Sequence, residues 1–231
     1  LLAPVERPIM TTVISVHSFR GGTGKSNTTS NLAAQLASAG NRVAVIDTDI
    51  QSPGIHVLFG FSDDLDNTLN DYLWGKMPIK DAAHDVTSVI AADIDVADGG
   101  ALYLVPSSMK AGDIARVLRE GYDVGTLNDG FRDLAKDLQL DYLLIDTAAG
   151  IGKAVVEFVL AAEHAILVVS PDPTSLTDSF ALTRVLKRNG YAGRLHVLVN
   201  NSEGMDAARK VYQRFSQAVE KYLQATVEWF G

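Results

Sequence analysis

The fold of this chain is decided by a stretch near its start, which reads Val13-Ile14-Ser15-Val16-His17-Ser18-Phe19-Arg20-Gly21-Gly22-Thr23-Gly24-Lys25-Ser26-Asn27. Apolar residues come first, then three glycines, a lysine and a hydroxyl residue, and a helical pattern follows. This order predicts a buried strand, a phosphate-binding loop and a helix. Glycines let successive backbone N–H groups turn toward an anion, and the positive end of the helix points at the same anion.

Lys25 and Ser26 follow the glycines at the positions that carry the chemistry of such a loop. We expect the Lys25 ammonium to reach the β- and γ-phosphates of a nucleotide and the Ser26 hydroxyl to bind Mg²⁺. The spacing departs from the strict G-x-x-x-x-G-K-[ST] pattern, because Phe19 stands where that pattern has its first glycine. The alternative interpretation is a glycine-rich turn that carries a lysine by chance. The other loop residues expected at the nucleotide are Gly21, Gly22, Thr23, Gly24 and Asn27.

The core Gly-Gly-x-Gly-Lys-Ser resembles the deviant Walker A loop of the MinD/ParA branch of P-loop ATPases. The resemblance runs in motif order over nearly all of residues 12–230, and it is nearest to MinD and to the flagellar-number regulators. That family carries a signature lysine before the glycine pair, which crosses to the phosphates of a partner subunit. Arg20 occupies this position here, so the resemblance implies either an arginine finger in trans or slower turnover.

Asp146 ends the buried run Leu-Leu-Ile-Asp, which is the layout of a Walker B carboxylate that holds Mg²⁺ through water. A strand-end aspartate that caps the next turn is the alternative. Residues 147–152 resemble the switch II loop of the family, with alanine in place of its proline, and Gly150 would let the backbone swing toward the γ-phosphate. Lys153, just past this loop, could supply an ammonium group across the dimer, although a surface lysine explains it equally well.

Asp47 and Asp49 follow the second predicted strand, where the family has its switch I motif. The resemblance implies that Asp49 positions the attacking water and that Asp47 supports the metal shell. Two carboxylates at i and i+2 on an extended segment project to opposite sides, so they cannot do the same job. The alternative for Asp49 is an aspartate that starts the turn before Pro53.

The segment 171–179 closely matches one in the flagellar-number regulators, and Asp178 falls on the family aspartate that organises the ATP dimer interface. From the residues alone, Thr174 or Ser175 is a suitable N-cap, and Asp178 would lie in the first helical turn. Asn200 ends another buried strand, at the family position whose side-chain amide reads adenine. A turn asparagine is the alternative, with Asn201 as a competing candidate.

Composition bounds the class of protein. The chain has 231 residues, 47% of them hydrophobic, which is enough for a substantial core. It has no cysteine, which excludes disulfides, thiolate metal sites and the iron–sulfur relatives of this loop family as working versions. A net charge of −8 argues against a generic nucleic-acid footprint, although local patches stay open. We expect a cytoplasmic protein, with peripheral membrane attachment through a segment beyond residue 231 as the MinD resemblance implies.

Strand patterns alternate with helix patterns, which predicts an α/β fold: one doubly wound, mostly parallel sheet with helices on both faces. We expect a single P-loop ATPase domain over residues 10–231 and a tag remnant or loose tail over 1–9. Residues 49–60 are predicted as a loop and 87–100 as a solvated insertion. The predicted strands are 12–18, 42–47, 102–105, 141–146, 165–170, 195–200 and 226–230. The predicted helices are 26–39, 68–74, 79–85, 111–120, 126–139, 153–162, 175–189 and 205–223.

The resemblance implies an ATP- and Mg²⁺-dependent switch that dimerises on ATP, hydrolyses it slowly under stimulation by a partner, and positions or counts a cellular cargo. A protein activator or a cargo adaptor is then the expected partner. Two alternatives stay open. One is a nucleotide-binding scaffold with little or no hydrolysis, and the other is a metabolic synthetase of the dethiobiotin or cobyrinate type. A bacterial tyrosine kinase is disfavoured, because the tail lacks a tyrosine cluster.

Overall fold

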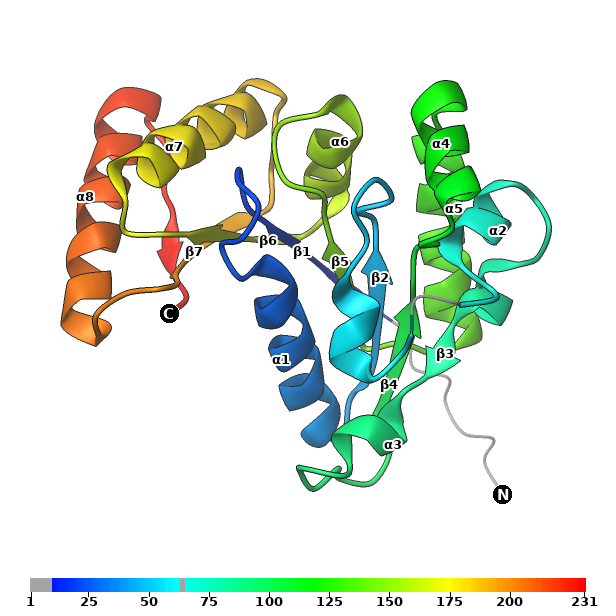
Figure 1. Cartoon of the computed structure of the whole chain (residues 1–231). Coiled ribbons are helices and arrows are strands. Elements are labelled where there is room, and N and C mark those ends of the chain that lie inside the picture. The colour runs from blue at the N-terminus through cyan, green and yellow to red at the C-terminus, as the bar shows by residue number, and fades with distance from the viewer. Residues whose placement is uncertain (1–9, 63–64) are drawn as a thin grey trace, which may run out of the picture.

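A computed structural model describes residues 10–62 and 65–231, and it shows one sheet with helices on both faces (Figure 1). The sheet has eight strands in the order β3-β4-β2-β5-β1-β6-β7-β8. All neighbouring pairs are parallel except β3–β4 at one edge. The strands are β1 (Thr12–His17), β2 (Arg42–Asp47), β3 (His84–Asp85), β4 (Ala101–Val105), β5 (Tyr142–Asp146), β6 (His164–Val169), β7 (Arg194–Val199) and β8 (Glu228–Trp229).

The predicted doubly wound α/β fold is confirmed. Helix α1 covers one face of the sheet together with η1 and α3, and helices α4 to α8 pack on the opposite face. The helices are α1 (Lys25–Ser38), α2 (Leu69–Leu73), α3 (Thr87–Ile90), α4 (Ala111–Glu120), α5 (Val124–Asp137), α6 (Lys153–Ala161), α7 (Pro173–Arg188) and α8 (Met205–Leu223), with the 3₁₀ turns η1 (Ile55–Phe59) and η2 (Ile79–Ala82).

Strand β2 shows why the central strands are apolar almost throughout. Val43 and Val45 point into the core under α1, whereas Ala44 and Ile46 point into the core under α5. All four are completely buried. A parallel strand with helices on both faces has no solvent face, so it shows no alternation of polar and apolar residues.

Two predicted segments are wrong in part, because tertiary packing decides them. Residues 79–85 were expected to form one helix. The structure has only the 3₁₀ turn η2 there, followed by β3, whose His84 pairs with Leu104 of β4. The predicted solvated insertion 87–100 contains α3, which buries Ile90 in the core under α1. Its acidic residues Asp93, Asp95 and Asp98 are exposed.

The predicted loop 49–60 also contains structure, because η1 places Ile55 and Phe59 against α1 and the sheet. Residues 1–9, expected to be a tag remnant or loose tail, lie outside the described residues. No helix in the described part of the chain is long and apolar enough to cross a membrane.

Candidate nucleotide site

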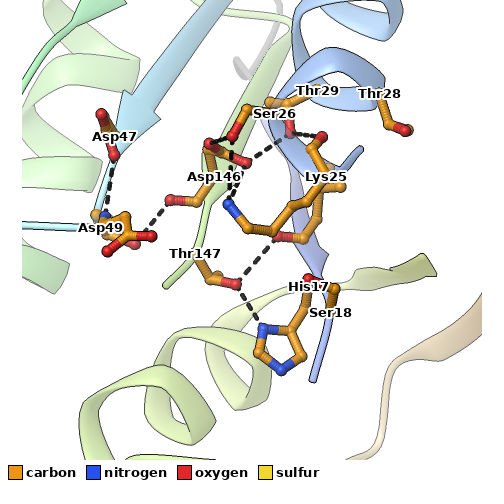
Figure 2. A network of polar contacts seen from close by, with 12 residues as sticks. His17, Ser18, Lys25, Ser26, Thr28, Thr29, Asp47, Asp49, Asp146 and Thr147 are labelled. Atoms are coloured by element: carbon orange, nitrogen blue, oxygen red, sulfur yellow. Dashed lines mark hydrogen bonds and ion pairs between the residues drawn. The ribbon is translucent and has the colours of Figure 1, made fainter. Parts of the chain in front are cut away.

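The phosphate-binding loop, Asp47, Asp49 and Asp146 gather where β1, β2 and β5 end. In the register of the sheet, Asp146 of β5 pairs with Val16 of β1 on one side and with Asp47 of β2 on the other. The loop after β1 leads straight into α1, so the first turn of α1 lies next to Asp146 (Figure 2). Carboxyl ends of parallel strands are where ligands bind in open α/β sheets.

The phosphate-binding loop adopts backbone conformations that favour glycine. Gly22 has φ of 78° and Gly24 has φ of 87°, and Gly24 is the N-cap of α1. A Cβ on Gly24 would lie only 2.2 Å from Nδ2 of Asn200. Asn200 Nδ2 donates a hydrogen bond of 2.8 Å to the Thr23 carbonyl, which ties the loop to the end of β7. The side chain of Phe19, which replaces the first glycine of the strict pattern, is partly buried and packs against the core that β6 and β7 form with α6, α7 and α8.

The carboxylate of Asp146 gathers three side chains of α1 (Figure 2). Lys25 Nζ lies 3.0 Å from Oδ1 as a buried ion pair. Ser26 Oγ donates to Oδ2 at 2.7 Å, and Thr29 Oγ1 donates to Oδ1 at 2.9 Å. Sequence reasoning missed Thr29. Its position four residues after Lys25 places both on the same face of α1, and this spacing was the available signal.

Asp47 and Asp49 add two further carboxylates to the site. Asp47 is buried and accepts the backbone N–H of Asp49 at 3.0 Å. Burial, and then the charge of Asp146, raise the pKa of Asp47 to about 8. Burial also raises the pKa of Asp49, whose Oδ1 accepts the N–H of Ser52 at 3.2 Å. Asp49 therefore starts the turn before Pro53, as the alternative interpretation expected. It follows the carboxyl end of β2, on the same side of the sheet as Asp146.

These oxygen donors fit Mg²⁺. The Ser26 hydroxyl and the carboxylates of Asp47 and Asp146 are hard ligands. Burial, and then the charge of Asp146, disfavour the ionised form of Asp47, and a divalent cation would offset both effects. Within residues 10–62 and 65–231, no group of three or more His, Cys, Asp and Glu side chains is arranged to hold a metal ion alone. Water and phosphate oxygens would therefore have to complete the coordination, which is the usual mode for Mg²⁺.

His17 and Thr147 link β1 to the segment 147–152, and sequence reasoning missed both. His17 is 2% exposed, and its Nδ1 lies 2.6 Å from Thr147 Oγ1, which itself donates to the Val16 carbonyl at 3.1 Å. Gly150, with φ of 99°, donates its N–H to the Ser18 carbonyl at 3.2 Å. Burial, and then the charge of Lys25, lower the pKa of His17 to about 3, so the imidazole is neutral.

Arg20 and Asp178 form an ion pair within the chain, with 2.5 Å between Arg20 Nε and Asp178 Oδ2. The expected position of Asp178 in the first turn of its helix is wrong, because α7 begins at Pro173. Its N-cap is Asp172, which accepts the N–H of Ser175 at 2.7 Å, so neither Thr174 nor Ser175 is the cap. Proline at the first helical position needs no N–H partner, which favours this earlier start.

Lys153 is not brought into the site. Its side chain is 90% exposed, and its nearest carboxylate is Glu157, at 3.7 Å and one helical turn away. Asn201 has φ of 57° and forms the turn after β7. A pocket of about 380 Å³ opens between α1 and the end of β7 and is lined by Gly24, Asn27, Thr28, Asn31, Leu32, Gln35, Leu198, Asn200 and Phe230.

A glycine loop, a lysine and a strand-end aspartate in this arrangement match a known family. The profile of the ParA family, described as NUBPL iron-transfer P-loop NTPase, matches residues 9–225. The chain belongs to the ParA family of P-loop NTPases. It has no cysteine, so it offers no thiolate ligand for the iron transfer in that description.

Relatives of this ParA-family chain include two bacterial regulatory or site-determining proteins. It is 32% identical to the antiactivator FleN of Pseudomonas aeruginosa, over 95% of this chain and 72% of FleN. It is 30% identical to the flagellum site-determining protein YlxH of Helicobacter pylori, over 92% of this chain and 66% of YlxH. The septum site-determining protein MinD of Pyrococcus horikoshii, solved with Mg-ADP, superposes with a TM-score of 0.68 at 28% identity, over 87% of this chain and 77% of MinD. The predicted MinD/ParA relationship is confirmed.

Proposed function

We propose that this protein is a Mg²⁺-dependent ATPase that acts as a switch: it dimerises on ATP, hydrolyses it slowly, and positions or counts a cellular cargo. The observation that carries the proposal is the convergence of Lys25, Ser26 and Thr29 on Asp146 beneath a glycine loop. The Mg-ADP bound to the similar MinD supports adenine nucleotide as the ligand. The names of FleN, YlxH and MinD, which refer to antiactivation and to site determination, support a regulatory or positioning role.

Nucleotide binding would redistribute the contacts of Asp146. Lys25 would leave Asp146 for the β- and γ-phosphates, while backbone N–H groups of Gly21, Gly22 and Gly24 face the same oxygens. Ser26 and Asp146, supported by Asp47, would hold Mg²⁺, which when bound neutralises phosphate charge. Asp49 would orient the attacking water.

The adenine is expected in the pocket between α1 and the end of β7. Asn200 uses Nδ2 to bind the Thr23 carbonyl, and its side-chain oxygen can accept from the 6-amino group of adenine. This contact would favour adenine over guanine, whose 6-oxygen accepts rather than donates. Asn27 lines the same pocket from the first turn of α1.

Two copies of the chain would close over the nucleotides, with Gly150 and Asp178 at the dimer interface. Arg20 would then act in trans, which requires it to leave Asp178. A protein activator or cargo adaptor would bind the closed dimer and accelerate hydrolysis. Peripheral membrane attachment through a segment beyond residue 231 would fit the same scheme. A contact with nucleic acid through a local surface patch is the less favoured interaction.

One observation favours a second candidate, a nucleotide-binding scaffold with little or no hydrolysis. Arg20 replaces the signature lysine of the family and is engaged by Asp178 in the same chain. Arginine has a different reach and a planar fork, so it does not reproduce the geometry of a lysine. Partner-stimulated phosphate release would favour the switch, whereas a stable ATP complex without release would favour the scaffold.

The test combines calorimetry with size-exclusion chromatography. We expect Mg-ATP and Mg-ADP to bind with one site per chain. We expect Asp49→Ala, which retains ATP, to elute as a dimer with ATP and as a monomer with ADP. The matched control is Asp129→Ala, an exposed carboxylate on α5, which should behave as the unchanged chain does. A chain without affinity for adenine nucleotides, or a monomer under both conditions, would contradict the proposal.

A further inference from the structure

Helices α7 and α8 form a groove on the face of the sheet opposite α1. The two helices lie side by side and pack on β6 and β7 (Figure 1). The groove has a volume of about 590 Å³. It is lined by Phe180, Arg184, Lys187, Arg188, Tyr222 and Leu223.

Within the described part of the chain, the cations of this α7–α8 groove have no carboxylate partner. Arg184 and Arg188 are exposed and lie one turn apart on α7, and neither forms an ion pair with any described residue. Lys187 donates to the carbonyls of Leu223 and Gln224 at the end of α8, so its ammonium also faces no carboxylate. Three positive charges therefore line one groove, and none of them forms an ion pair with a described carboxylate.

The groove lies in the part of this acid-rich chain where cations outnumber carboxylates. The chain carries 28 Asp and Glu against 20 Lys and Arg, yet residues 173–231 carry eight Lys and Arg against five Asp and Glu. Carboxylates are abundant elsewhere on the surface, but no carboxylate of residues 10–62 or 65–231 forms an ion pair with Arg184 or Arg188. This arrangement leaves a positive potential available to an external acidic group.

The α7–α8 groove is also lined by apolar and aromatic side chains. Phe180 is half-buried, and its ring lies nearly perpendicular to the ring of Tyr222, with 6.4 Å between the two centroids. Tyr222 is 68% exposed, although a tyrosine that served only to fill the core would be covered. Exposed aromatic residues beside arginines are the composition of the energetic centre of protein–protein interfaces.

We propose that the α7–α8 groove binds an acidic peptide segment of a partner protein. An apolar side chain of that segment packs against the rings of Phe180 and Tyr222 from the groove, and flanking carboxylates meet Arg184 and Arg188 as charge-assisted hydrogen bonds. Duplex DNA fits less well, because it needs cations spread along a phosphate track and the chain as a whole carries −8. A bilayer surface fits less well, because the aromatic and apolar residues line a concave groove rather than a protruding face.

The test uses fluorescence anisotropy with a short fluorescein-labelled peptide in which Glu and Asp flank Phe and Leu. The control peptide carries Lys in place of the acids. We expect saturable binding of the acidic peptide alone, weakened by salt. Reversal of both charges, Arg184→Glu with Arg188→Glu, should weaken binding by a factor of at least about ten. The matched control reverses two exposed lysines outside the groove, Lys80→Glu with Lys136→Glu, and should change binding by less than about twofold.

Tyr222→Ala provides a second route that leaves the charges in place, and it should weaken binding by a factor of about ten. Circular dichroism and the urea midpoint confirm that each variant is folded. Absence of saturable binding by the unchanged chain, or equal binding by the charge-reversed variant, would overturn the proposal. Binding of duplex DNA or of phosphatidylserine vesicles that is lost on charge reversal, without peptide binding, would assign the groove to that ligand instead. The proposal does not depend on nucleotide, so its failure is distinguishable from failure of the ATPase proposal.

Discussion

At the scale of single residues, the carboxylate of Asp146 connects the strand β5 to the first turn of α1. It compensates the buried ammonium of Lys25 and accepts hydrogen bonds from Ser26 and Thr29. The side chains of Lys25 and Asp146 are only 9% and 2% exposed, so water cannot solvate either charge. A buried pair adds little net stability over an apolar pair, but removal of one partner leaves an isolated charge in the interior.

The variant Asp146→Asn tests this account of the buried ion pair. Asparagine keeps the shape and can still accept one hydrogen bond, but it removes the charge that balances Lys25. We expect the free energy of unfolding to fall by about 3–5 kcal/mol, measured by urea denaturation. Asp129→Asn, whose side chain is 68% exposed, is the matched control and should change stability by less than about 0.5 kcal/mol. Equal urea midpoints for the two variants would contradict a buried ion pair at Asp146.

The variant His17→Thr tests the neutral state of the buried imidazole. Its pKa is lowered from 6.5 to about 3, so between these pH values the unfolded chain binds a proton that the folded chain excludes. The free energy of unfolding of the unchanged protein therefore loses on the order of a few kcal/mol from this group as the pH falls through that window. Threonine suits a strand and does not titrate, so the variant should lose less stability on acidification.

The measurement for His17 is the urea midpoint of both proteins at a series of pH values from neutral to about 4. Carboxylates titrate in both, so the difference between the two curves isolates the imidazole. Parallel curves would mean that His17 can be protonated in the folded chain, contrary to its burial beside Lys25.

At the scale of elements, the sequence predicted what local pattern determines. The strands β1, β2 and β5 were readable because helices cover both faces and make them continuously apolar, and α1 was readable from the glycines before it. The short edge strand β3 was not readable, because its pairing with β4 depends on a neighbour that is distant in sequence. The same reason hides α3, whose burial of Ile90 follows from the position of the sheet.

The candidate site likewise contains residues that local sequence pattern predicts and residues that it does not predict. The loop residues and Asp146 were predictable because their spacing along the chain is fixed by the strand–loop–helix order. The pairing of Arg20 with Asp178 was not predictable, since it joins the loop after β1 to α7, which is distant in sequence. The role of Thr29 depended on the rotation of α1, and that of His17 on which side of β1 lies under the segment 147–152.

A prediction on catalysis follows from the two cations near α6 and α7. Arg20 is already placed at the loop, whereas the Lys153 side chain is 90% exposed and directed to Glu157. We expect Arg20→Ala to lower ATP turnover by a factor of at least about 10² and Lys153→Ala to change it by less than about twofold. Phosphate release at saturating Mg-ATP is the measurement.

Measurements of stability distinguish a loss of catalysis in Arg20→Ala from misfolding of this variant. The Arg20 side chain is 53% exposed, so the coupling between Arg20 and Asp178 in a double-mutant cycle should stay under about 1 kcal/mol. A folded Arg20→Ala protein with unchanged turnover, together with unchanged turnover in Lys153→Ala, would exclude both residues as fingers.

At the scale of the whole molecule, the parallel sheet places the candidate nucleotide contacts at the carboxyl ends of its strands. Arg20, Asp49, Asp146 and Asn200 come from four different strand ends and reach one side of the fold. In the proposed dimer, two copies would meet at these strand ends through a two-fold interface, and each chain would complete the site of the other. A shared site of this kind makes a defect in one chain correctable by a different defect in its partner.

Mixing two inactive variants tests this directly. In a dimer of Arg20→Ala with Asp49→Ala, the site on the first chain keeps its own Asp49 and receives Arg20 from the second chain, while the other site lacks both. Random pairing makes half of the dimers mixed, with one complete site in two, so an equal mixture should recover about a quarter of the turnover of the unchanged protein. Each variant alone stays inactive and is the control. If Arg20 serves the nucleotide of its own chain, every site in the mixed dimer lacks one group. The mixture would then recover nothing, and the proposal of a finger in trans would be wrong.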